Sequence, residues 1–164
     1  MKWNYSGTYF ASGGNDNKMF VFSPKSKYPL MKKKHKAAVK ALDWSSKKLN
    51  LLASGAGSAD RKLRIWDTQT NNLVLKKDTG SQICNLRFLK DKNEIVTSHG
   101  FSNNEICLWD LKSLQKKATL LGHSQRVLYL SMSPCGKFIV SGAGDETLRF
   151  WKISMEKNNE QKIV

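Results

Sequence analysis

Short runs of apolar, β-branched and aromatic residues alternate with polar turns along almost the whole chain. The clearest example lies near the end, where three such runs occupy residues 127–133, 138–140 and 147–153. A turn at residues 133–136 separates the first two runs, and a glycine-rich turn that ends at Gly144 precedes the third. Runs this short, bounded by Pro, Gly, Asn and Asp, are typical of antiparallel strands and not of helices. The pattern therefore predicts an all-β fold.

Two markers show that this unit repeats. The third run of each unit carries an aromatic residue, at intervals of 44, 43 and 42 residues: Phe22, Trp66, Trp109 and Trp151. The second run carries a serine, at intervals of 42, 44 and 43 residues: Ser12, Ser54, Ser98 and Ser141. A period of about 40–45 residues built from short strands is typical of the WD-repeat β-propeller, in which each repeat forms one blade. Four repeats are predicted, at residues 1–33, 34–77, 78–121 and 122–153, followed by a polar tail at 154–164.

A polar tetrad is expected inside the best-preserved repeats. In WD repeats a His before the first strand, a Ser in the second, an Asp in the following turn and a Trp in the third form a buried hydrogen-bonded network, which suits their donors and acceptors. A Ser-His-Asp hydrolase triad is the alternative, but the serine lacks a G-x-S-x-G turn and the set recurs within the chain. The predicted tetrads are His35, Ser54, Asp60 and Trp66 in the second repeat and His123, Ser141, Asp145 and Trp151 in the fourth.

The first and third repeats depart from this pattern. In the first repeat Phe22 replaces the Trp, residues 2–4 are predicted to end an inner strand, and residues 28–31 are predicted to form the outer strand. In the third repeat residues 78–80 stand where a Gly-His pair is expected, so its tetrad is predicted to be incomplete. His99, which follows Ser98, is predicted to be a polar loop residue.

Both ends of the repeat array are expected to leave sheet edges open. The first repeat offers only the end of an inner strand, and the fourth shows no clear outer strand. Because blades normally contact two neighbours, such edges would be unpaired. The sequence therefore predicts the C-terminal part of a larger propeller, with seven blades favoured over a closed ring of four. We expect the isolated chain to self-associate through these edges.

Composition excludes several classes of protein. Apolar residues make up 40% of the chain without any run approaching 18 residues, which predicts no membrane span. The three cysteines, Cys84, Cys107 and Cys135, lie far apart, which argues against a zinc site and for a reducing compartment. The net charge of +15 comes mostly from lysine, but base-stacking aromatic pairs are not interleaved with it, so nucleic acid is an unfavoured partner. No cofactor or metal is predicted.

Several loops contain sequences that are more specific than the general WD-repeat pattern: residues 12–17 (SGGNDN), 35–41 (HKAAVKA), 54–61 (SGAGSADR), 78–86 (DTGSQICNL), 122–128 (GHSQRVL) and 144–149 (GDETLR). Together they closely resemble the Fizzy and Fizzy-related coactivators of the anaphase-promoting complex. The resemblance runs from Lys2 to Ile153 and corresponds to blades four to seven of that family's seven-bladed propeller. Residues 127–130 and 142–145 look nearer to Fizzy-related than to Fizzy, but one sequence leaves both open.

The resemblance implies a substrate receptor, not an enzyme, acting in the nucleus and cytoplasm in cell-cycle control. Its partners would be proteins that bear KEN-box or destruction-box degrons and, in a full-length protein, subunits of the anaphase-promoting complex. Glu146 would contact the destruction box. The KEN-type contacts carried over from the family motifs are Asn15, Asn17, Ser58, Gln82 and Arg126, with Ser58 replacing the usual Thr.

The placement of these residues in turns is consistent with that function. In a propeller, the turns between second and third strands and the links from outer strands to the next inner strands emerge on one face. Amides, a hydroxyl and a guanidinium gathered there can bind a short polar peptide. The alternatives are that each residue only stabilises its turn, or that the chain is a general WD scaffold that binds another protein or nucleic acid through its lysines. The family's C-box and Ile-Arg tail are not found in this sequence.

Overall fold

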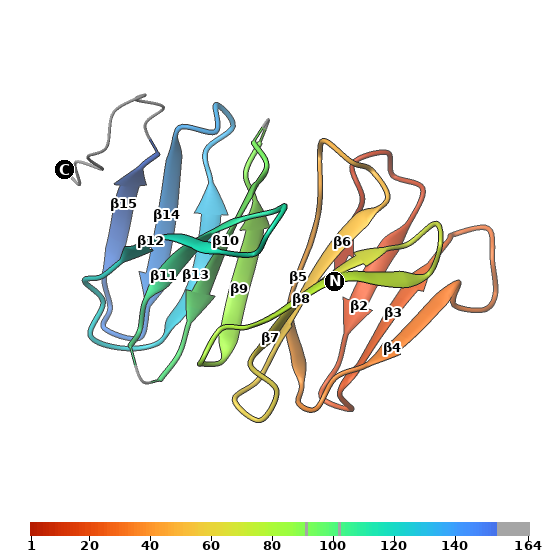
Figure 1. Ribbon diagram of the computed structural model, residues 1–164, viewed down its shortest axis with the longest axis horizontal. Coiled ribbons are helices and arrows are strands. Elements are labelled where there is room, and N and C mark those ends of the chain that lie inside the picture. Colours follow the sequence, from red (N-terminus) through yellow and green to blue (C-terminus); the bar gives the residue numbers. More distant parts are fainter. Residues whose placement is uncertain (91, 102, 154–164) are drawn as a thin grey trace.

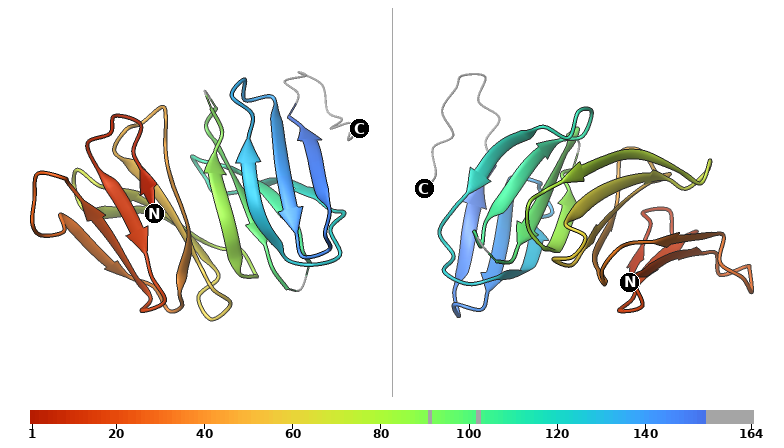
Figure 2. Two further views of the ribbon diagram at one scale, coloured as in Figure 1. Left: turned by 180° about the vertical axis from the view of Figure 1, so that it is seen from behind. Right: turned by 60° about the horizontal axis from the view of Figure 1, so that its bottom comes forward.

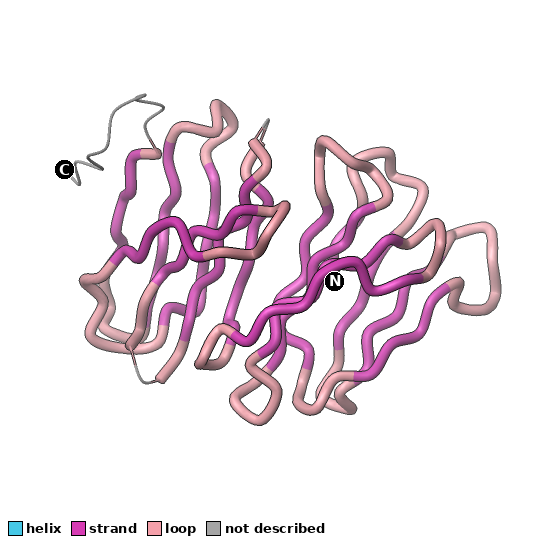
Figure 3. The backbone as a smooth tube through the Cα atoms, viewed as in Figure 1, coloured by secondary structure: helices cyan, strands magenta, loops and turns pink. Residues whose placement is uncertain are grey.

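The computed structural model describes residues 1–90, 92–101 and 103–153, and the predicted polar tail at 154–164 lies outside the described residues. The described residues form fifteen strands joined by turns and loops, and they include no helix (Figure 3). The all-β prediction is therefore confirmed. No helix in the described part is long and apolar enough to cross a membrane.

The strands form four antiparallel sheets in chain order (Figure 1). The first sheet contains β1 (Lys2–Trp3), β2 (Phe10–Gly13), β3 (Lys18–Phe22) and β4 (Met31–Lys34). The second contains β5 (Val39–Trp44), β6 (Leu51–Ala56), β7 (Lys62–Asp67) and β8 (Asn72–Asp78). The third contains β9 (Ile83–Phe88), β10 (Glu94–His99), β11 (Ile106–Asp110) and β12 (Lys116–Leu120). The fourth contains β13 (Val127–Met132), β14 (Phe138–Ala143) and β15 (Leu148–Lys152).

The sheets follow one another in an arc, with the first strand of each sheet facing the first strand of the next (Figure 2). Three hydrophobic clusters fill the spaces between neighbouring sheets. Trp44 and Met19 lie in the cluster between the first two sheets, Phe88 and Ile65 in the middle one, and Ile139 in the last. Each sheet alone is a thin layer, so its apolar face becomes buried only when the next sheet packs against it.

Glycine is required where the inner strand of one sheet presses on its neighbour. A Cβ atom on Gly13 would lie 2.6 Å from the carbonyl oxygen of Val39, and one on Gly55 would lie 2.5 Å from Cγ2 of Ile83. Real Cβ atoms do not approach neighbours this closely, so these two positions set the spacing between successive sheets.

The outer strand of the first sheet differs from the prediction. β4 covers Met31–Lys34, whereas residues 28–31 were expected to form it. Pro29 has no backbone N–H, and the Ser26 hydroxyl donates to the carbonyl of Tyr28, so the chain is still in a loop there. The lysine run therefore lies on the outer strand itself, paired with β3.

The fourth sheet leaves much of its apolar surface uncovered. Tyr129, Leu148 and Phe150 are 71%, 70% and 65% exposed, in contrast to the buried aromatic residues between the other sheets. Two cysteines, Cys84 and Cys107, are buried, and Cys135 is exposed.

Candidate functional site

The loops predicted to bind a peptide lie along one edge of the four sheets, the lower edge in Figure 1. This edge holds the turns between second and third strands and the links from each outer strand to the next inner strand. Backbone hydrogen bonds join these loops in succession. Val39 N–H donates to the carbonyl of Gly14 (3.1 Å), Gly57 to Ala38 (3.0 Å) and Thr79 to Arg61 (3.0 Å).

Asn15 and Asn17 occupy the turn between β2 and β3. Asn15 is exposed and Asn17 is half-buried. Asn17 has a φ of +66°, a left-handed conformation that asparagine tolerates better than most residues. Its carbonyl accepts the backbone N–H of His35 (2.8 Å), which ties this turn to the link between β4 and β5. Asn17 therefore has a structural role through its backbone, which leaves its side-chain amide for other contacts.

Ser58 lies at the tip of the turn between β6 and β7 and is exposed. The turn is closed by hydrogen bonds from Asp60 and Arg61 N–H to the carbonyl of Gly57 (2.9 and 3.0 Å). The Ser58 hydroxyl is thus held by a rigid turn on the same edge as the asparagines.

Gln82 and Arg126 flank the turn between β10 and β11, which the sequence analysis did not single out. The carbonyl of Gln82 accepts the N–H of Gly100 (3.2 Å), and a Cβ atom on Gly100 would lie 3.3 Å from the Arg126 side chain. The guanidinium of Arg126 lies 5.3 Å from the ring centre of Phe101, a cation–π contact. Phe101 is 71% exposed, and an aromatic residue in an otherwise polar turn was the signal that could have revealed it.

Glu146 lies in the turn between β14 and β15 and is exposed, with a φ of +63°. This turn is joined to the loop of Arg126 by the N–H of Gly144, which donates to the Arg126 carbonyl (3.2 Å). The structure thus places all six predicted contact residues on one edge. Glu146 belongs to the last sheet of the arc and the two asparagines belong to the first.

The second repeat contains the expected polar network beneath these loops. The His35 ring contacts Asp60 through Nδ1 (3.0 Å) and Ser54 through Nε2 (3.0 Å), and Trp66 Nε1 donates to Ser54 (2.7 Å). Since a carboxylate only accepts, Nδ1 carries the proton and the Ser54 hydroxyl donates to Nε2. Burial and the nearby Arg64 charge lower the pKa of His35. Burial alone would raise the pKa of Asp60, but hydrogen bonds from Arg64 and His35 hold it well below its ordinary value.

The fourth repeat contains the same arrangement. His123 contacts Asp145 (2.9 Å) and Ser141 (2.8 Å), and Trp151 Nε1 donates to Ser141 (2.8 Å). Ser141 is fully buried, and its oxygen already accepts the indole N–H. This geometry argues against the hydrolase alternative, because a nucleophilic hydroxyl must be accessible to its substrate.

The third repeat holds a network that the sequence analysis missed. Trp109 Nε1 donates to Thr97 (2.7 Å), Thr97 contacts His99 Nε2 (2.7 Å), and His99 Nδ1 contacts the hydroxyl of Ser81 (2.9 Å). Two interpretations were therefore wrong. His99 is fully buried at the end of β10 and is not a loop residue, and Ser98 is not the equivalent of Ser54.

The error at Ser98 is a shift of one residue. Trp109 pairs with Ile95 of β10. Thr97 is two residues after Ile95 and therefore lies on the same face of β10 as Ile95, whereas Ser98 lies on the other face. The Ser98 hydroxyl instead donates to the carbonyl of Val127 in the fourth sheet (2.9 Å). Burial lowers the pKa of His99 to about 4, and its ring nitrogens contact hydroxyls, not a carboxylate.

Metal binding finds no support on this edge. Within residues 1–90, 92–101 and 103–153, no three His, Cys, Asp or Glu side chains gather closely enough to hold a metal ion. The predicted contact residues offer amides, a hydroxyl, a guanidinium and a carboxylate, which are groups that can bind a peptide by hydrogen bonds and charge.

Comparison with known proteins identifies the repeats. The family described as WD domain, G-beta repeat matches residues 27–67 and 114–152. Protein FIZZY-RELATED 3 of Arabidopsis thaliana is 53% identical over 93% of this chain, and Meiotic fizzy-related protein 1 of Schizosaccharomyces pombe is 52% identical over all of it. The chain is built from WD repeats and is similar to the Fizzy-related proteins. The predicted WD40 propeller fold and the predicted resemblance are thereby confirmed.

Two further comparisons show how much of the known proteins this chain matches. The APC/C activator protein CDH1 of Saccharomyces cerevisiae is 51% identical over 93% of this chain. A chain in the Crystal Structure of Mitotic Checkpoint Complex superposes with a TM-score of 0.89 and 37% identity, over 92% of this chain and 47% of that chain. The chain spans about a third of the length of the curated relatives it matches: 32% of FIZZY-RELATED 3, 39% of the S. pombe protein and 27% of CDH1.

Proposed function

We propose that this chain is part of a substrate receptor that activates the anaphase-promoting complex by recognising KEN-box and destruction-box degrons in cell-cycle control. It would act as a non-catalytic adaptor, in the nucleus and cytoplasm. Support comes from the relatives, one of which is named an APC/C activator and is 51% identical over 93% of this chain. Its partners would be degron-bearing proteins and, within a full-length protein, subunits of the complex.

The observation that carries the proposal is that the six residues expected from the family motifs lie on one edge. Asn15, Ser58, Arg126 and Glu146 are exposed there, and backbone hydrogen bonds hold their loops in succession. A surface assembled from preformed turns loses little conformational freedom when a peptide binds. This arrangement suits a short peptide that crosses several blades.

The chemistry of a KEN peptide matches these groups. The peptide presents an ammonium, a carboxylate and a carboxamide within three residues. Arg126 would bind the carboxylate in a charge-assisted pair, and the side-chain amides of Asn15, Asn17 and Gln82 would exchange hydrogen bonds with the carboxamide and the backbone. Phe101 lies against the guanidinium of Arg126 in a cation–π contact.

A destruction box would use a different part of the surface. Glu146 is exposed in the turn of the last sheet, and its carboxylate would pair with the arginine of that degron. The two degrons should therefore respond to different substitutions.

The test uses a protein that joins this chain to the remaining blades of a Fizzy-related propeller. Arg126→Ala should weaken binding of a fluorescent KEN peptide by about 1.5–3 kcal/mol, the range for a hydrogen bond to a charged group. Glu146→Ala should weaken a destruction-box peptide and leave the KEN peptide unchanged. Lys76→Ala, an exposed charge on the outer strand β8, is the matched control and should leave both peptides bound.

Two results would overturn the assignment. One is that the unsubstituted propeller binds neither peptide; the other is that both variants lose both peptides equally. Salt-dependent binding of nonspecific RNA, together with indifference to KEN peptides, would instead support the general scaffold.

A further inference from the structure

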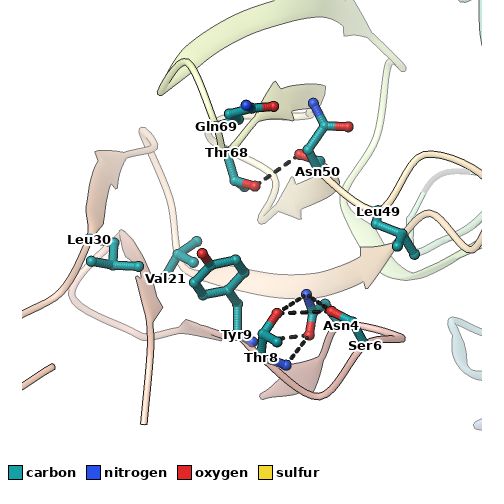
Figure 4. A pocket seen from close by; sticks show the side chains of 10 residues that line it. All are labelled: Asn4, Ser6, Thr8, Tyr9, Val21, Leu30, Leu49, Asn50, Thr68 and Gln69. Atoms are coloured by element: carbon teal, nitrogen blue, oxygen red, sulfur yellow. Dashed lines mark hydrogen bonds between the residues drawn. The ribbon is translucent and has the colours of Figure 1, made fainter. Parts of the chain in front are cut away.

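A cavity of about 390 Å³ lies between the first two sheets, at the edge opposite the candidate degron site (Figure 4). Its apolar wall contains Tyr9, Val21, Leu30 and Leu49, and the side chains of Asn50, Thr68 and Gln69 also line it. Binding sites for small ligands and single side chains are commonly concave, mostly apolar, and about 300–1,000 Å³ in volume. The cavity falls within this range and has no part in the proposed degron binding.

The loops that form this cavity are held in place by their own hydrogen bonds. Buried Asn4 fixes the loop between β1 and β2, because its Oδ1 accepts the N–H groups of Thr8 and Tyr9, each at 3.0 Å. The Thr68 hydroxyl donates to the carbonyl of Asn50 (2.9 Å) and thereby joins the loop between β7 and β8 to the loop between β5 and β6. The cavity is therefore preformed, so a ligand would not need to order it.

Large apolar side chains surround the opening. Leu30, Leu49 and Tyr9 line the cavity and are 51%, 50% and 37% exposed. Isolated exposed apolar residues are ordinary on protein surfaces, but a group of them around a cavity marks a site for another molecule.

The charge of these four loops has one sign. Residues 4–9, 23–30, 45–50 and 68–71 together contain four lysines and no Asp, Glu or Arg. Among the described residues none of these lysines forms an ion pair. The lysines are Lys25, Lys27, Lys47 and Lys48. These lysines belong to the two loops that also carry Leu30 and Leu49, so this part of the surface is complementary to a partner that is acidic and carries an apolar anchor.

We propose that this cavity is a second docking site, which binds an acidic protein segment through one bulky aliphatic or aromatic side chain. The anchor side chain packs against Leu30, Leu49 and Tyr9. Carboxylates on either side of the anchor meet the lysines of the two adjoining loops. The amides of Asn50 and Gln69 hydrogen-bond to the backbone of the segment.

The cavity fits a peptide better than a nucleic acid. The apolar part of its wall contains three aliphatic residues, Val21, Leu30 and Leu49, and a single aromatic residue, Tyr9, whereas single-stranded nucleic acid is usually held by successive bases stacked on several aromatic faces. The four loops also lack arginine, the side chain that most often stacks on bases and pairs with phosphates.

The test measures binding of fluorescein-labelled acidic heptapeptides that differ only in the central residue: Ala, Leu, Met, Phe or Trp. With the unsubstituted chain, the best large central residue should bind at least about tenfold more tightly than Ala, because burying several methylene groups contributes on the order of that factor. Leu30→Ser combined with Leu49→Ser should abolish this preference. Leu73→Ser combined with Val74→Ser, two comparably exposed positions on β8, is the matched control and should retain it.

Charge reversal provides the second arm. Lys47→Glu combined with Lys48→Glu should weaken every acidic peptide at least about fivefold at low salt, since opposite charges near the surface attract most strongly there. Lys76→Glu combined with Lys77→Glu changes the net charge equally at two exposed positions of β8 and should leave affinity within about twofold. The proposal is overturned if no peptide binds at 1 mM, if the central residue has no effect, if the two charge reversals weaken binding equally, or if oligouridylate RNA binds and the peptides do not.

Discussion

Replacing Thr97 by Val tests the network of the third repeat directly. Thr97 is fully buried and lies on the same face of β10 as Ile95, opposite Trp109. Valine keeps the branched shape that suits a strand but removes the hydroxyl. The substitution therefore isolates the hydrogen bonds of Thr97 from its packing.

The expected loss follows from the two partners of that hydroxyl. The Trp109 indole N–H, now 2.7 Å from Thr97, would become a buried donor without an acceptor, which costs about 1–3 kcal/mol. Loss of the hydrogen bond to His99, also 2.7 Å, adds about 1 kcal/mol. Thr97→Val should thus lower the free energy of unfolding by about 2–4 kcal/mol, whereas Thr97→Ser, which retains the hydroxyl, should cost far less.

Ser98→Ala is the decisive comparison. It removes a single hydrogen bond to the carbonyl of Val127 and should cost about 0.5–1.5 kcal/mol. The assay is urea unfolding at pH 7, followed by circular dichroism and tryptophan fluorescence, with equal slopes required for all variants. If Ser98→Ala costs more than Thr97→Val, or if Thr97→Ser costs as much as Thr97→Val, the assignment of the network to Thr97 is refuted.

Three further predictions concern stability and association. Trp151→Phe or His123→Ala should lower the free energy of unfolding by about 1–3 kcal/mol, measured in urea, because each leaves buried partners around Ser141 unsatisfied. The folded pKa of His99 is about 4, below its ordinary 6.5, so the unfolded chain binds more protons at this residue between these values. The contribution of His99 to stability is then full above pH 6.5 and falls by at most about 3 kcal/mol as the pH drops toward 4. His99→Gln should reduce the slope of stability against pH in urea titrations at pH 7, 6 and 5. The chain should form concentration-dependent oligomers in sedimentation experiments through the exposed face of the fourth sheet, and Leu148→Lys with Phe150→Glu should reduce them, whereas a monomer at all micromolar concentrations before substitution would contradict this.

Most strands could be predicted from the sequence because each blade repeats one pattern. The aromatic residues of the third strands recur at nearly constant intervals, and the structure places Phe22, Trp66, Trp109 and Trp151 on the third strand of successive sheets. The outer strand of the first sheet was misplaced because the aromatic and apolar residues at 28–31 suggested a strand, although Pro29 interrupts hydrogen bonding there.

The error at Ser98 shows what periodicity alone cannot resolve. Thr97 and Ser98 both fit repeat intervals of 42–44 residues, so the spacing does not choose between them. Only the alternation of faces along β10, counted from the residue opposite Trp109, distinguishes them. The pairing register that provides this reference is a property of the folded sheet.

Only part of the candidate site could be predicted from the sequence. The turns that hold Asn15, Ser58 and Glu146 follow from strand positions, so their shared edge could be predicted. The contact between Phe101 and Arg126 could not, since the two residues belong to different sheets and meet only when the sheets pack. The cavity at the opposite edge arises in the same way, because neither of the first two sheets contains it alone.

The three polar networks follow from one requirement, the buried indole N–H of the third strand. Where Trp66 or Trp151 provides that donor, a serine accepts it and a histidine from the preceding loop contacts the serine. In the third repeat Thr97 accepts from Trp109, but the histidine comes from β10 itself, and Ser81 of the preceding loop takes the place of the carboxylate. In the first repeat the side chain of Phe22 has no N–H, and no equivalent histidine network is found among the described residues. The histidine position can therefore vary as long as every buried donor has an acceptor.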